Sequence, residues 1–181
     1  MERNSAVVVA AGKSTRMLGT DKVFLNLGGL PLVCHSIEAF EKCGMFDEII
    51  VVVTDDNIDM ASDIFLRMNY KNVRIIGGGN RRQDSVKKGL SAIATCDYVA
   101  IHDGARPFLT NRLLRNGLEV VKKTGAAVPV VKIHDTVKNI SNHGTIGSTL
   151  NRDCLRLVQT PQFFGYDLIM RAHEEIIEDS N

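Results

Sequence analysis

The sequence lacks any marked excess of charge of one sign. Its 181 residues include 22 Lys and Arg and 21 Asp and Glu, so the formal net charge is +1. This balance gives no electrostatic case for binding nucleic acid or a membrane surface. No apolar run approaches membrane-spanning length, and the first five residues do not resemble a signal peptide. Any anion-binding site must therefore be local.

Cysteine is also scarce, and its spacing does not indicate a metal site. The four cysteines are Cys34, Cys43, Cys96 and Cys154, and none forms a CxxC pair or has a histidine at metal-ligand spacing. This pattern predicts reduced thiols in a cytoplasmic protein.

What the sequence does contain is a regular alternation of strand-like and helix-like segments, over a length that predicts one domain, residues 1–181. The strand-like runs are rich in Val and Ile and cover residues 6–10, 48–53, 73–76, 98–101 and 126–131. Helical spacing covers residues 31–43, 57–68, 81–94, 110–123 and 166–177. The alternation predicts an α/β fold with a doubly wound, mostly parallel sheet and helices on both faces.

The pattern changes after residue 131. Residues 132–156 have weak periodicity, several β-branched residues and turn signals at 141–144 and 147–148. We interpret them as a protruding β-arm, which cannot bury itself and should pack on a second subunit. The alternative is a long surface loop, which is unusual in a compact domain. Residues 159–164 look like an extended segment that supports packing.

The loop after the first apolar run has the composition of a phosphate-binding loop. Ala10, Ala11 and Gly12 precede a cationic stretch that includes Arg16, and Lys22 lies shortly beyond. Small side chains let the backbone approach a ligand, successive N–H groups form an anion nest, and Arg and Lys neutralise charge. A polyphosphate suits this loop, because α/β folds place ligands after the first strand. The alternative is a plain strand-to-helix turn.

Two familiar phosphate motifs are excluded. The P-loop needs a glycine where this chain has Val7, and the dinucleotide fingerprint needs glycines where Ser14 and Met17 stand.

A second glycine-containing segment, residues 77–86, runs from a strand through three glycines into a helix start. Exposed N–H groups near Gly79, together with the side chains of Asn80 and Ser85, fit the recognition of polar base edges. The alternative is a tight turn with Asn80 as the helix N-cap.

A third polar segment, residues 102–108, lies at the end of a buried strand. The Asp103 carboxylate is placed for a ribose hydroxyl or a phosphate-bound Mg²⁺. A structural ion pair with Arg106 is the alternative, and His102 is interpreted as a buried structural histidine. On the arm, Thr136 and Arg152 fit a phosphomonoester, or else belong to a solvated surface.

Taken in order, several segments resemble the 2-C-methyl-D-erythritol 4-phosphate cytidylyltransferases of the non-mevalonate isoprenoid pathway. The segments are AAGKSTRM, DKVFL, GGNRRQDSV, HDGARPF, DTVK, LNRD and QTPQFF, and they span almost the whole chain. The ordered set is specific to the sugar-phosphate cytidylyltransferases, although each segment alone is weak. Ribitol-5-phosphate cytidylyltransferases share much of the pattern and are the alternative, but HDGARP and LNRD look more like the methylerythritol enzymes.

The resemblance implies a Rossmann-like sheet that binds CTP with Mg²⁺, and a homodimer built through the β-arm. It implies transfer of a cytidylyl group from CTP to 2-C-methyl-D-erythritol 4-phosphate, with release of pyrophosphate. By position, it assigns catalysis to Arg16, Lys22 and Arg152, the acceptor phosphate to Thr136 and Arg152, and the metal to Asp103. It assigns CTP binding to Ala10, Ala11, Gly12, Gly79, Asn80, Ser85, Asp103 and Ala105.

The chain departs from the family pattern at several positions. Ser14 stands where a glycine is usual, Asp21 where a proline is usual, and Asn80 where an acidic or small residue is usual. The sequence also ends before the DDAS-like motif and the lysine of an NIKIT-like strand with which the family usually closes. A shortened form that binds CTP without catalysing transfer is therefore a second hypothesis.

Overall fold

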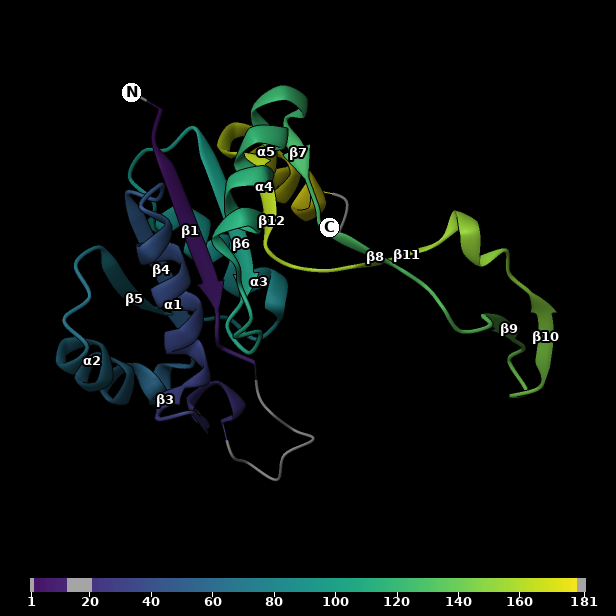
Figure 1. Cartoon of the computed structure of the whole chain (residues 1–181), viewed down its shortest axis with the longest axis horizontal. Coiled ribbons are helices and arrows are strands. Elements are labelled where there is room, and N and C mark those ends of the chain that lie inside the picture. The colour runs from purple at the N-terminus through teal and green to yellow at the C-terminus, as the bar shows by residue number, and fades with distance from the viewer. Residues whose placement is uncertain (1, 13–20, 179–181) are drawn as a thin grey trace.

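The computed structural model describes residues 2–12 and 21–178, and it describes side chains as far as residue 175. A six-stranded sheet with the order β5-β4-β1-β6-β12-β7 runs through the middle of the molecule (Figure 1). Its strands are β1 (Asn4–Val9), β4 (Glu48–Val53), β5 (Val73–Gly77), β6 (Tyr98–Asp103), β7 (Ala126–Ala127) and β12 (Gln162–Gly165).

The first four strands of this sheet are parallel. Val7 at the centre of β1 lies opposite Ile50 of β4 on one side and opposite Ile101 of β6 on the other. β12 then pairs antiparallel with β6 and with β7. The expected α/β fold with a mostly parallel sheet is confirmed.

Helices cover both faces of the sheet because its central strands are apolar on both sides. Val8 faces the layer formed by α1 (Leu32–Cys43), α2 (Ile58–Arg67) and α4 (Asn111–Thr124). Val7 faces the layer that contains α3 (Arg82–Ala92) and α5 (Tyr166–Glu178). Both valines have no exposed surface, as expected for strands covered from two sides.

The helix ends follow the local chemistry of the chain. α1 begins directly after Pro31 and ends at Gly44, which has a φ of 66° that favours glycine. α3 begins at Arg82 with Arg81 as its N-cap, so Asn80 is not the cap. No helix within residues 2–12 and 21–178 is long and apolar enough to cross a membrane.

One sequence-based prediction about strands is wrong. Residues 126–131 do not form one buried parallel strand: they divide into β7 and β8 (Val130–Lys132), with Pro129 between them. Proline has no backbone N–H to donate to a neighbouring strand, so it interrupts the ladder. The segment 159–164, expected to be extended and to support packing, runs into β12, whose Phe163 is 1% exposed.

The predicted β-arm is β-rich and projects away from the sheet (Figure 1). Its inner part pairs β8 with β11 (Arg156–Val158), and its outer part pairs β9 (Lys138–Ile140) with β10 (Ile146–Thr149). Every residue of these four strands is exposed. Residues 130–158 form the arm.

Candidate functional site

The order of the strands places a crevice at the carboxyl ends of β1 and β6. After β1 the chain adds β4 and β5 on one side, and it then crosses to the other side of β1 to form β6. Ligands of open α/β sheets bind at such a reversal, outside the carboxyl ends of the strands. Val9 at the end of β1 lies opposite Asp103 at the end of β6. The predicted phosphate loop and the predicted metal ligand therefore begin at the same edge.

The turn after β5 lies against the end of β1. A Cβ atom added at Gly78 would lie 2.4 Å from Cβ of Ala11 and 3.0 Å from Oγ of Ser85, so only glycine allows this approach. The Gly78 N–H donates to the carbonyl of Val53 at 2.7 Å, and the Gly79 N–H donates to Oγ of Ser85 at 3.0 Å. The structure thus brings together Ala11, Gly79 and Ser85, three of the residues that the family resemblance assigns to CTP binding.

The other small residues of the site have different surroundings. Ala10 is 1% exposed and donates its N–H to the carbonyl of Val52 at 2.7 Å, so it helps to fix the start of the loop. Ala105 is half-buried and packs against the core beneath α1 and α4. Gly12 and Asn80 are exposed at the rim.

Two arginines hold the Asp103 carboxylate. Arg82 donates from Nε at 3.0 Å and from Nη2 at 2.7 Å to Oδ1, and Arg106 donates from Nε to Oδ2 at 3.1 Å. The Arg106 guanidinium also donates to Oε1 of Gln159, which lies just beyond the arm. The ion pair between Asp103 and Arg106 that the sequence left as an alternative is present.

A buried histidine fixes the turn that carries this carboxylate. His102 has no exposed surface, and burial lowers its pKa to about 4, so the ring is neutral. Its Nε2 lies 3.0 Å from the carbonyl oxygen of Arg106, and its Nδ1 lies 2.9 Å from Oγ1 of Thr160. A carbonyl can only accept, so Nε2 carries the proton and Nδ1 accepts from the Thr160 hydroxyl. Oγ1 of Thr160 in turn accepts from the Asp103 N–H at 3.3 Å.

One of the two predicted cations, Lys22, lies within the described residues. Arg16 lies outside the described residues. Lys22 is exposed at the start of a 3₁₀ turn, Lys22–Phe24. The side chain of the preceding Asp21 accepts a hydrogen bond from Asn57, which follows β4. The segment with Lys22 therefore returns to the carboxyl edge of the sheet.

The predicted acceptor residues lie on the arm, apart from the carboxyl edge of their own sheet (Figure 1). Thr136 is exposed between β8 and β9, and Arg152 starts a 3₁₀ turn between β10 and β11. Nη1 of Arg152 donates to the carbonyl of His134, so the two predicted residues lie on facing segments between the inner and outer strand pairs of the arm.

Comparison with known proteins identifies the family. The 2-C-methyl-D-erythritol 4-phosphate cytidylyltransferase family matches residues 5–181. Relatives of that name from Dehalococcoides mccartyi and Clostridium novyi are 42% and 41% identical over 97% and 99% of this chain. The chain covers 78% and 79% of the length of these relatives. This chain belongs to the 2-C-methyl-D-erythritol 4-phosphate cytidylyltransferase family.

Solved structures of this family show the same fold. The 4-diphosphocytidyl-2C-methyl-D-erythritol synthase of Anaerococcus prevotii has a TM-score of 0.86 at 30% identity, with 98% of this chain and 77% of that chain covered. The 2-C-methyl-D-erythritol 4-phosphate cytidylyltransferase of Thermus thermophilus has a TM-score of 0.76 at 30% identity, with 100% and 79% covered. The expected family and its nucleotidyltransferase class are confirmed.

One Mg²⁺ ion would fit the donor atoms at this edge only with most of its ligands supplied by substrate. Within the described residues, no group of three or more His, Cys, Asp and Glu side chains is gathered as for a protein-only metal site. Mg²⁺ is usually bound by one or two carboxylates together with substrate phosphates. Asp103 supplies one such carboxylate, with 29% of its side chain exposed at the carboxyl edge.

Sequence reasoning missed three residues of this site: Arg82, Gln159 and Thr160. Arg82 is separated from Asp103 by 21 positions, and Thr160 is separated from His102 by 58. No local pattern links them. The glycine turn before α3 marks the neighbourhood of Arg82, but only the folded sheet shows which carboxylate it meets.

A separate cavity of about 300 Å³ lies at the amino ends of the strands. Its lining is polar but internally paired: Arg74 lies 2.8 Å from Glu48, and Arg3 donates to Thr95 at 2.9 Å. These pairs hold neighbouring segments of the chain together. The candidate site lies at the other edge of the sheet, at the carboxyl ends of the strands.

Proposed function

We propose that the carboxyl edge of the sheet binds CTP with Mg²⁺ and transfers its cytidylyl group to 2-C-methyl-D-erythritol 4-phosphate. The observation that supports this best is the meeting of Ala11, Gly79 and Ser85 beside Asp103 at the strand reversal, in a chain of this family. The N–H of Gly79 is already bonded to Ser85, which holds the turn in shape for the recognition of a base edge. Arg16, Lys22 and the backbone of residues 10–12 would face the triphosphate.

The proposed chemistry needs no base and no covalent intermediate. The acceptor phosphate is already an oxyanion, so its oxygen attacks the α-phosphorus of CTP in line. The new P–O bond forms while the bond from the α-phosphorus to the bridging oxygen breaks, and the electron pair leaves with pyrophosphate. The protein has to position the two phosphates and to neutralise their negative charge. Arg16, Lys22 and Arg152 would supply the positive charge for this. Bound Mg²⁺ would add neutralisation of phosphate oxygens beside Asp103.

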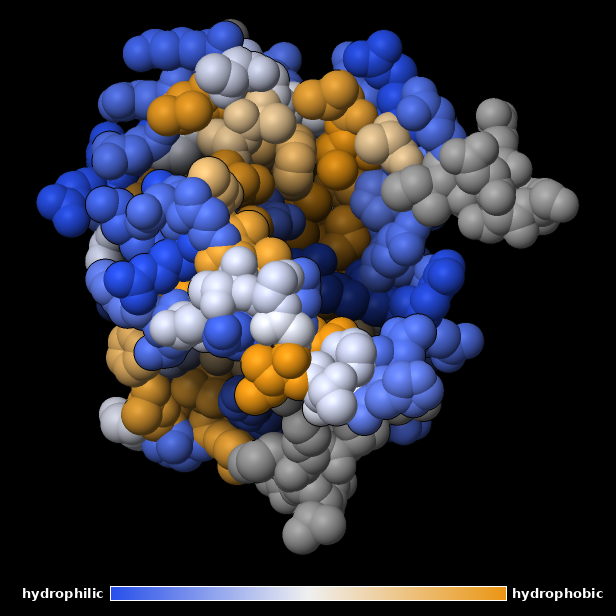
Figure 2. All heavy atoms as spheres, turned by 90° about the vertical axis from the view of Figure 1, so that its right-hand side faces the viewer, coloured by the Kyte–Doolittle hydropathy of each residue, from blue (hydrophilic) through white to orange (hydrophobic). Residues whose placement is uncertain are grey.

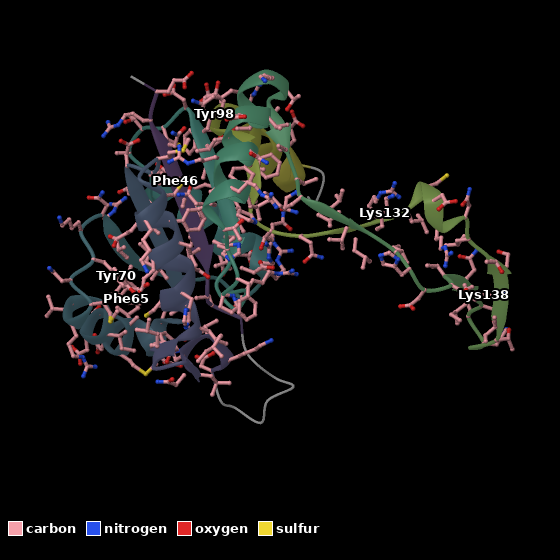
Figure 3. The ribbon with its side chains drawn as sticks, in the orientation of Figure 1. Phe46, Phe65, Tyr70, Tyr98, Lys132 and Lys138 are labelled. Atoms are coloured by element: carbon pink, nitrogen blue, oxygen red, sulfur yellow. The ribbon has the colours of Figure 1, made fainter. Side chains whose placement is uncertain are left out.

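We further propose that the arm belongs to a homodimer and delivers Thr136 and Arg152 to the acceptor phosphate in the partner's site. The arm is an isolated ribbon that leaves large apolar side chains exposed: Val130, Val131, Ile140, Ile146, Leu157 and Val158 are between 47% and 73% exposed. Figure 2 views the molecule along the arm and shows further hydrophobic surface around it. Lys132 and Lys138 lie along the same ribbon (Figure 3), so it combines apolar contact area with positive charge.

The location that fits this proposal is the cytoplasm. All four cysteines are free thiols, and Cys34 and Cys43 are buried. Unpaired thiols are usual where the surroundings are reducing.

The first test measures pyrophosphate release from CTP and Mg²⁺, with 2-C-methyl-D-erythritol 4-phosphate and ribitol 5-phosphate supplied separately. We expect turnover with 2-C-methyl-D-erythritol 4-phosphate and none with ribitol 5-phosphate. Turnover with ribitol 5-phosphate instead would assign the alternative acceptor. CTP binding by calorimetry without turnover would identify a non-catalytic form, and absence of both would contradict the proposed function.

A second test asks whether the arm serves the partner's site. Asp103→Asn alters the sheet edge and Arg152→Ala alters the arm, so each homodimer should be inactive. A mixed dimer would contain one doubly altered site and one wholly natural site. Random mixing should therefore restore about a quarter of wild-type activity. No recovery, with mixed dimers confirmed by mass, would show that the arm serves its own subunit.

A further inference from the structure

Both oxygens of the Asp103 carboxylate are occupied by arginine. Oδ1 accepts two hydrogen bonds from Arg82, at 3.0 and 2.7 Å, and Oδ2 accepts one from Arg106 at 3.1 Å. Of the about four lone-pair positions of the carboxylate, Arg82 takes both on Oδ1 and Arg106 takes one on Oδ2. A Mg²⁺ ion bound at the remaining position would lie beside two guanidinium groups, and repulsion between these like charges favours the release of one arginine when metal binds with nucleotide.

The two arginines are not held equally. The Arg106 guanidinium also donates to Gln159, its N–H donates to the carbonyl of Asp103 at 3.0 Å, and its own carbonyl accepts from His102. Within the described residues, the hydrogen bonds and the ion pair of the Arg82 side chain all go to Asp103, and 51% of that side chain is exposed. Arg82 is thus the arginine that can leave without disturbing the turn.

Arg82 also occupies the right place to meet phosphate. It is the first residue of α3, three positions after Gly79 in the base-reading turn, and its guanidinium reaches across to the end of β6. It therefore spans the same crevice that residues 10–12 border at the end of β1. A guanidinium is always charged, and its planar fork matches phosphate oxygens, so an arginine released here has a ready second partner.

We propose that Arg82 is an exchangeable phosphate ligand, which holds Asp103 while the site is free of nucleotide and transfers to the CTP phosphates when Mg²⁺ takes the carboxylate. The exchange keeps the carboxylate neutralised at each stage, because one cation replaces another. It also adds a positive charge to the triphosphate only when the metal is in place. This inference rests on the proposed function, since it takes CTP with Mg²⁺ as the ligand of this edge.

The test compares Arg82→Gln with Arg81→Gln in the full chain. Arg81 is the neighbouring arginine, but it pairs with Asp84 at 2.8 Å and is 73% exposed, so its replacement removes the same charge without touching Asp103. CTP binding in the presence of Mg²⁺ and without acceptor is measured by calorimetry, and thermal melting confirms folding of both variants. Arg82→Gln should weaken CTP binding about tenfold, equal to about 1.4 kcal/mol, whereas Arg81→Gln should change it less than about twofold.

A second measurement separates exchange from simple positioning. The Mg²⁺ concentration that gives half-maximal velocity at saturating CTP should fall in Arg82→Gln, because the metal no longer competes with a guanidinium. A residue that merely holds Asp103 in place would have the opposite effect, since its loss would raise the Mg²⁺ requirement. That rise, or CTP affinity equal to the wild type, or equal weakening in Arg81→Gln, would overturn the inference. Failure of the wild-type protein to bind CTP would instead overturn the proposed function itself.

Discussion

The buried ring of His102 makes a quantitative prediction about stability and pH. Its pKa falls from 6.5 in the unfolded chain to about 4 in the folded protein, because burial disfavours the charged ring. Below pH 6.5 the unfolded chain therefore binds more protons than the folded protein. The stability that depends on a neutral ring is fully present above that value and is lost as the pH falls toward 4. Linkage gives a loss of about 2 kcal/mol between about pH 7 and pH 5.

Urea unfolding of the wild-type protein and of His102→Gln measures this loss. Glutamine does not titrate, and every other group is common to both proteins, so their difference isolates the ring. The wild type should lose about 2 kcal/mol more than the variant over this pH range. Equal losses would refute the reasoning, and so would an NMR titration of the His102 ring with a midpoint near 6.5. The NMR titration needs no variant, so it stands even where His102→Gln folds poorly.

Three further outcomes follow from particular contacts. Asp103→Asn should abolish pyrophosphate release while far-ultraviolet circular dichroism stays unchanged, since it removes two ion pairs and the charge that is proposed to bind metal. Retained turnover would exclude Asp103 from the chemistry. Gly117→Ala should lower the free energy of unfolding, measured in urea, by about 1–3 kcal/mol, because the added Cβ would lie 2.1 Å from the Phe163 ring. An increase of about 1 kcal/mol, as is usual for this exchange within a helix, would show that the ring moves aside. The exposed Cys154 thiol should react with a thiol reagent in the native protein, whereas Cys34, which is buried and has a raised pKa, should react only on unfolding.

The sequence predicts the centre of the fold better than its edge. The Val- and Ile-rich runs identify β1, β4, β5 and β6, because strands covered on both faces must be almost wholly apolar. At the edge the signal weakens. β7 is only Ala126–Ala127, and its pairing with Phe163 depends on a strand that returns after the whole arm. Such pairing is a tertiary contact, and local periodicity carries no information about it.

The same division applies to the candidate site. Residues that follow strand ends, such as Ala11, Gly79 and Asp103, can be predicted, because parallel strands bring their carboxyl ends to one edge. The partner of Asp103 cannot be predicted in this way. Arg106 is three positions from Asp103 in the sequence, which makes it an expected partner, but Arg82 comes from α3 and meets the carboxylate only after the sheet has formed.

The arm leaves and rejoins the body at neighbouring points. β7 and β12, which flank it in sequence, are paired antiparallel in the sheet, and beyond them the Gln159 N–H donates to the carbonyl of Pro129 at 2.9 Å. In effect the arm is the extended tip of a hairpin whose base is built into the sheet. Residues gained or lost at its far end change neither sheet register nor core packing. Evolution can therefore vary the reach of the arm independently of the nucleotide site, and an engineer can close the hairpin early with a short turn to obtain the body alone.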